Sequence, residues 1–138
     1  MYLRFTSPDA LRLGLRGGKL VHSGIFGSAY RVRRDKTYPQ YLRQAIAREL
    51  NWFEDELPVP PYARFQVRSK TWWRSQGICW FRAEAREMVR RAYGLRSLLA
   101  ECDILISQLH TDRPGQILYK DDFQIIAKPA AETPTVWT

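Results

Sequence analysis

Arginine supplies 17 of the 22 basic side chains in this chain, and these arginines are the residues best suited to chemistry with a partner. Their planar guanidinium group can bind a phosphate or carboxylate through two parallel hydrogen bonds and can stack on a ring. Arg82, Arg86 and Arg90 are spaced four residues apart, so a helix would place them in one row. Such a row either meets phosphates or forms ion pairs with Glu84 and Glu87.

A second basic group comprises Arg31, Arg33, Arg34 and Lys36, with Tyr30 and Tyr38 on either side. Alternating cations and rings are typical of proteins that follow the backbone of a single-stranded nucleic acid and stack its bases. The other interpretation is a solvated strand end.

Two adjacent tryptophans, Trp72 and Trp73, lie between Arg68 and Arg74. Successive side chains on a strand point to opposite faces, so one tryptophan is expected at an edge of the fold. A tryptophan beside arginine is typical of an interface anchor or a stacking platform.

The chain has two histidines, His22 and His110, and together they could perform acid–base cleavage of RNA. The alternative is that each is an ordinary strand-end residue. Cys79 and Cys102 are far apart in apolar runs and are expected to be buried free thiols. The sequence contains no phosphate loop, nucleophile motif or metal-ligand cluster, so we predict no metal, no cofactor and no named reaction.

The composition predicts one folded domain with a basic surface. The chain has 138 residues, of which 45% are hydrophobic, and a net charge of +8. This charge favours polyanions, because basic surfaces release the counterions condensed on nucleic acid, although it can also serve solubility alone. No stretch approaches the ~20 apolar residues of a membrane span, and no secretory signal is present, so we expect a cytoplasmic protein without membrane contact.

Hydrophobic spacing and turn residues predict a mixture of strands and helices. Helices are expected over 8–15, 38–57 and 82–102. Strands are expected over 2–5, 19–22, 29–33, 63–67, 77–81 and 103–109, followed by a hairpin of 117–119 with 123–127.

This order predicts an α+β fold, in which two long helices and one short helix pack on one face of a single, mostly antiparallel sheet. Residues 1–129 are expected to form one globular domain, and residues 130–138 a flexible C-terminal tail.

Several short motifs, spread over most of residues 20–129, resemble a family of small uncharacterised bacterial proteins. They are Gly77-Ile78-Cys79-Trp80-Phe81, Trp52-Phe53-Glu54, Leu57-Pro58-Val59-Pro60 and the stretch 113–121. The resemblance implies a single intracellular domain of unknown activity and transfers no catalytic residue to this chain.

Taken together, these observations predict a small basic domain that binds nucleic acid or another polyanion. The binding residues are expected to be Arg31, Arg33, Arg34, Arg82, Arg86 and Arg90, with Trp72 or Trp73 stacking at an edge. One alternative is a regulatory module whose arginines bind an acidic protein surface. A metal-independent ribonuclease using His22 and His110 is the third hypothesis.

Overall fold

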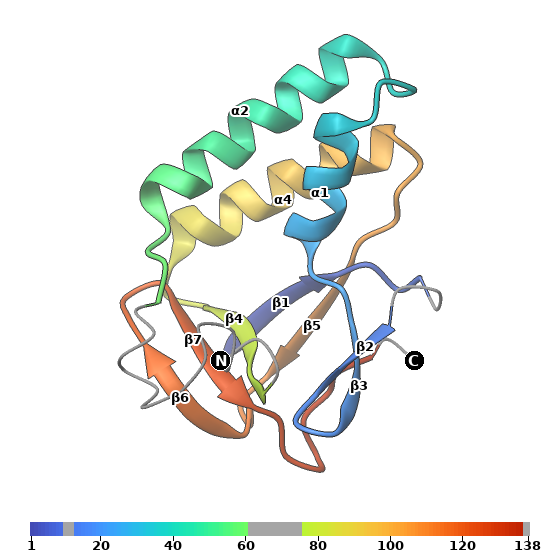
Figure 1. The fold of residues 1–138 in the computed structure, drawn as a ribbon. Coiled ribbons are helices and arrows are strands. Elements are labelled where there is room, and N and C mark those ends of the chain that lie inside the picture. The colour runs from blue at the N-terminus through green and yellow to red at the C-terminus, as the bar shows by residue number, and fades with distance from the viewer. Residues whose placement is uncertain (10–12, 61–75, 137–138) are drawn as a thin grey trace.

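The computed structural model describes residues 1–9, 13–60 and 76–136, and Figure 1 shows a helical layer above a sheet. The described helices are α1 (Ile25–Arg34), α2 (Gln40–Glu56) and α4 (Arg86–Glu101). The described strands are β1 (Tyr2–Thr6), β2 (Leu13–Arg16), β3 (Lys19–His22), β4 (Ile78–Arg82), β5 (Ser107–Thr111), β6 (Gln116–Lys120) and β7 (Gln124–Lys128).

Five strands form one sheet in the order β5-β1-β4-β7-β6, and every neighbouring pair is antiparallel. The remaining strands, β2 and β3, form a separate hairpin. The predicted α+β class with a mostly antiparallel sheet is therefore confirmed.

Two apolar clusters form because successive strand residues point to opposite faces of the sheet. Phe5 of β1 and Phe81 of β4 belong to a cluster that includes buried residues of the three described helices. Trp80 of β4 and Ile125 of β7 belong to the other cluster, which Val21 of the β2–β3 hairpin completes. The sheet thus has helices against one set of side chains and a hairpin against the other.

The two long helices follow the predicted spacing of apolar residues. In α2, Leu42, Ile46, Leu50 and Phe53 are buried, and the helix ends just before Leu57 and Pro58. Helix α4 begins four residues later than predicted, because Arg82 still belongs to β4 and a turn over 82–85 separates strand from helix. Met88, Ala92, Leu95 and Leu99 form its buried stripe.

The predicted strand over 29–33 is wrong, since residues 25–34 form α1. Tyr30 to Arg33 alternate like a strand, and Gly27 is unfavourable inside a helix. The buried residues Ile25, Ala29 and Val32 nevertheless recur at helical spacing, and packing them into the helical cluster decided the outcome.

The predicted helix over 8–15 is also wrong, because β2 occupies residues 13–16. Gly17 and Gly18 have positive φ angles of 55° and 82° between the paired residues Arg16 and Lys19. Two consecutive residues with positive φ make the tight turn that joins antiparallel strands, so they close a hairpin here and do not end a helix.

Strands at 2–5, 19–22 and 77–81 and the C-terminal hairpin are confirmed, whereas β5 begins four residues later than predicted. The predicted strand over 63–67 lies outside the described residues. Residues 130–136, expected to belong to a tail, pack against the hairpin, with Thr133 and Thr135 buried. Lys19 Nζ donates to the carbonyl oxygens of Ala130, Ala131 and Thr133.

Candidate functional site

The α1 basic group, which we define as Arg31, Arg33, Arg34 and Lys36, lies at the C-terminal end of α1. Cations at this end of a helix are favoured by its dipole whatever their function. The Arg33 guanidinium lies 4.7 Å from the centre of the Tyr30 ring and 3.7 Å from a carboxylate oxygen of Glu54. Arg33 therefore has internal partners.

The other members of this group differ in whether their side chains have described partners. Arg31 Nη2 donates to Ser28 Oγ over 3.1 Å, and the side chain is half-buried. Arg34 and Lys36 are exposed, and neither has a side-chain partner among the described residues. These two are the members of the group that are open to an external anion.

A side-chain turn fixes the backbone beside Lys36. The Asp35 carboxylate accepts hydrogen bonds from Thr37 N at 3.0 Å and from Thr37 Oγ1 at 2.7 Å. These bonds lower the pKa of Asp35, and the carboxylate is ionised at neutral pH. The turn constrains the backbone of Lys36, which lies between its two residues.

The α4 basic row, defined as Arg82, Arg86 and Arg90, is largely paired within the molecule. Arg90 donates through two of its nitrogens to the Glu87 carboxylate, and this bonding lowers the pKa of Glu87. Arg82 donates to the Asp121 carbonyl oxygen at 3.1 Å and lies 3.7 Å from a carboxylate oxygen of Glu84. Arg86 is exposed and has no side-chain partner among the described residues.

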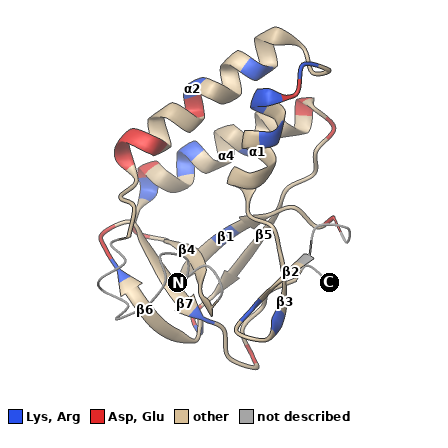
Figure 2. Cartoon of the chain, in the orientation of Figure 1, with Lys and Arg blue, Asp and Glu red and all other residues tan. Residues whose placement is uncertain are grey.

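Arg91, next to this row, connects two helices. Its guanidinium lies 4.7 Å from the centre of the Trp52 ring and 3.5 Å from the Glu49 carboxylate, both on α2, while Nε donates to Glu87. Figure 2 shows the basic segments of α1 and α4 on separate helices, with acidic segments of α2 and α4 beside them. The two predicted arginine clusters do not merge into one uniformly basic face.

The remaining predicted site residues are dispersed. Trp72 and Trp73 lie outside the described residues. His110 is exposed on β5 opposite Leu3, whereas His22 is buried on β3. His22 lines a pocket that His110 does not reach.

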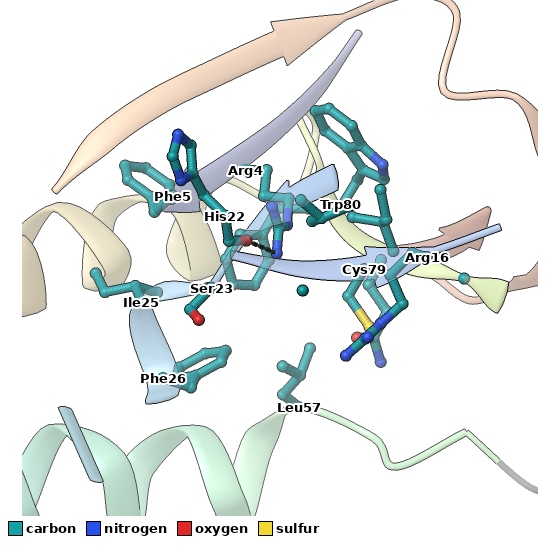
Figure 3. A pocket seen from close by; sticks show the side chains of 17 residues that line it. Arg4, Phe5, Arg16, His22, Ser23, Ile25, Phe26, Leu57, Cys79 and Trp80 are labelled. Carbon is teal, nitrogen blue, oxygen red and sulfur yellow. Dashed lines mark hydrogen bonds between the residues drawn. The ribbon is translucent and has the colours of Figure 1, made fainter. Parts of the chain in front are cut away.

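That pocket, which the sequence analysis missed, has a volume of about 300 Å³. Figure 3 shows it between strand residues such as Arg4, Arg16 and Cys79 and the helical-layer residues Phe26 and Leu57. The β1–β4 ladder contains two residue pairs, Tyr2 with Arg82 and Leu3 with Phe81. Arg4 follows the last pair and lines the pocket that opens there.

Arg4 is a buried cation in this pocket. Its Nη2 donates to the His22 carbonyl oxygen at 2.9 Å, and its buried Nη1 has no hydrogen-bond partner in the described part of the chain. The guanidinium lies deep in the molecule, although part of the side chain remains accessible because the pocket opens onto it. Burial lowers the pKa of Arg4 to about 10, Cys79 opposes this shift and Arg16 adds to it. The group is still protonated at neutral pH.

The N-terminal turn of α1 forms another wall of the pocket, through Gly24, Ile25 and Phe26. Gly24 is the N-cap residue and has no side chain that could accept a hydrogen bond from the free N–H groups of this turn. The turn also contains no acidic residue. None of the described residues that line the pocket is Asp or Glu. Two cations and a helix N-terminus therefore surround a space suited to an anion.

Comparisons with family models, curated proteins and solved structures find no match for this chain. Within the described ranges, no group of three His, Cys, Asp or Glu side chains could hold a metal ion. None of the helices in that part of the chain is long and apolar enough to cross a membrane.

Proposed function

We propose that this chain is a bacterial cytoplasmic protein that binds nucleic acid or a similar polyanion through exposed cations of its helical layer. The observation that supports the proposal best is the exposure of Arg34 and Lys36 at the end of α1. Both are exposed and lack side-chain partners among the described residues, and both lie beside Arg31 and Arg33. A phosphate backbone would supply partners for these two side chains.

Arg86 is the second expected contact, because it is the exposed, unpaired member of the α4 basic row among the described residues. Arg82, Arg90 and Arg33 would contribute less, since binding through them competes with their carboxylate partners. Trp72 or Trp73 stacking on a base stays part of the proposal.

The test is the salt dependence of binding to fluorescent single- and double-stranded oligonucleotides. The slope of log affinity against log salt concentration counts the phosphates engaged, at about 0.7 each for single strands and about 0.9 for duplexes. We expect Arg34→Glu to weaken binding and to reduce the slope by about one contact, and Arg86→Glu to do the same.

Lys120→Glu is the matched control, because it makes the same change of charge on β6, far from α1 in Figure 1. An equal loss of affinity in Lys120→Glu and Arg34→Glu would show that net charge alone drives binding, and would refute the proposed surface. Absence of binding even at low salt would refute nucleic acid as the partner and would favour an acidic protein surface.

A further inference from the structure

The pocket around Arg4 holds a positive charge that the described part of the protein does not neutralise. Among the described residues, the guanidinium has one hydrogen-bond partner, the His22 carbonyl oxygen, and its Nη1 has none. No described Asp or Glu lines the pocket, and Arg16 is the other charged residue among its described lining. Burying a cation without an anion is unfavourable, so a ligand that supplies the anion would be bound favourably.

The N-terminus of α1 approaches the same guanidinium. A β-carbon added to Gly24 would lie 3.7 Å from Arg4 Nη2, which places the start of the helix directly beside the fork of donors. Free backbone N–H groups and the helix dipole favour an anion at this position. Arg4 and α1 thus provide two independent sets of donors for one group.

The chemistry of the pocket distinguishes between classes of anion. Two guanidinium groups and a helix N-terminus carry more positive charge than one carboxylate can neutralise. They suit the phosphate of a monoester, which has two negative charges and three free oxygens. Phe26, Phe81 and Leu57 add an apolar wall, and Phe26 and Phe81 lie with their ring centres 6.3 Å apart. A volume of about 300 Å³ is at the small end for ligand pockets.

We propose that this pocket binds a small phosphomonoester with a flat, apolar remainder, whose phosphate lies between Arg4 and the N-terminus of α1. This site is distinct from the exposed cations at the other end of α1, and either site can exist without the other. The Gly24 backbone gives a direct way to test it.

Gly24→Asp would place a carboxylate where the ligand's phosphate is proposed to bind. Gly24 has φ −73° and ψ 165°, the extended conformation in which Asp caps a helix, and an added β-carbon makes only ordinary contacts. We expect this variant to have a higher Tm without ligand, because the carboxylate meets both Arg4 and the free N–H groups. Gly27→Asp is the matched control, since Gly27 is exposed in the same turn and does not line the pocket.

The experiment is a thermal-unfolding titration with millimolar phenyl phosphate, benzoate and inorganic phosphate. For the unchanged protein, we expect phenyl phosphate to raise Tm by about 3 °C or more and the other two compounds to raise it less. Gly24→Asp should lose this shift, and Gly27→Asp should keep most of it. Arg16→Ala, which changes only a half-exposed lining side chain, should weaken binding about tenfold and keeps the test valid if Gly24→Asp does not fold.

Three results would overturn the proposal. One is no shift of the unchanged protein with phenyl phosphate, which would leave Arg4 as a purely structural link between β1 and β3. Another is an equal shift with benzoate, which would remove the preference for phosphate. The third is a shift that persists in Gly24→Asp, which would place the ligand elsewhere. Oligonucleotide binding through Arg34 is measured separately, so failure of one proposal does not imply failure of the other.

Discussion

His22 lies buried on β3, and its Nδ1 has no hydrogen-bond partner among the residues that the structure describes. Burial lowers the pKa of His22, the charge of Arg4 lowers it further, and Asp9 acts in the opposite direction. The folded protein therefore favours the neutral imidazole, whereas the unfolded chain takes up a proton near pH 6.5. Protonation of His22 favours the unfolded state.

The free energy of unfolding should consequently be greatest above pH 7 and fall as the pH is lowered through about 6.5, because the unfolded state then binds more protons. Replacing His22 with Gln should reduce this dependence, and His110→Gln, at an exposed position on β5, should leave it unchanged. Urea unfolding of both variants at several pH values between 5.5 and 8 measures this dependence. If the free energy of unfolding of His22→Gln varied with pH as it does in the unchanged protein, His22 would not be its source.

Individual arginines show what residue type and spacing can predict and what they cannot. The pairing of Arg90 with Glu87 follows from their spacing on one helix, and the sequence left it open as an alternative to phosphate binding. Arg91 instead meets Glu49, 42 residues away on another helix, and Arg33 meets Glu54. Such partners depend on how helices pack, so the sequence alone did not separate Arg34 and Arg86 from their paired neighbours.

At the level of elements, one side chain links the β2–β3 hairpin to residues 130–133. Lys19 Nζ donates to three carbonyl oxygens of residues 130–133 at distances of 2.6 to 3.1 Å. Lys19→Met keeps the aliphatic stem but leaves these oxygens without their donor. We expect a loss of about 1–3 kcal/mol in the free energy of unfolding.

Lys120→Met serves as the control for Lys19→Met, because Lys120 is exposed on β6 without a described side-chain partner. Its effect should stay within about 0.5 kcal/mol. Equal effects of the two substitutions in urea unfolding would show that the contacts of Lys19 contribute nothing to stability.

Elements with a strong internal pattern were predictable, and those that depend on their neighbours were not. Helix α2 has a regular apolar stripe and a proline stop, and the C-terminal hairpin has a turn in which Asp121 accepts from Phe123 N and Gln124 N. Helix α1 contains Gly27 and a strand-like alternation, and burial of the helix among the other helices overrides both. The Gly17-Gly18 pair is compatible with a helix end as well as with a hairpin turn, so the helix predicted over 8–15 was placed where β2 lies.

The pocket could not be predicted because no local segment contains it. Its walls come from β1, β2, β3, β4 and β7, the start of α1 and the residue after α2. The sequence does show one sign of it, which is a single arginine, Arg4, inside the otherwise apolar strand 2–5. The predicted fold has helices on one face of the sheet, which leaves the other face, and an arginine on it, to solvent. In the structure, the β2–β3 hairpin covers that other face.

The whole molecule has two apolar clusters that share one sheet, and this predicts a single cooperative unfolding transition. Leu50 of the helical cluster and Ile125 of the hairpin cluster are both fully buried. We expect Leu50→Ala and Ile125→Ala each to lower the free energy of unfolding by about 2–5 kcal/mol. Far-UV circular dichroism and tryptophan fluorescence should move together in both variants. A split between the two signals in either variant would show that the clusters unfold independently.

The contacts of Lys19 join residues 111 to 114 positions apart, so they also set an order of events during synthesis. A nascent chain on the ribosome can assemble α1 and α2 long before residues 130–135 emerge to fasten the hairpin. The hairpin supplies Arg16, Val21 and His22 to the pocket. A growing polypeptide therefore has most of its helical core before it has a finished binding site, and ligand capture can begin only when translation has passed residue 135.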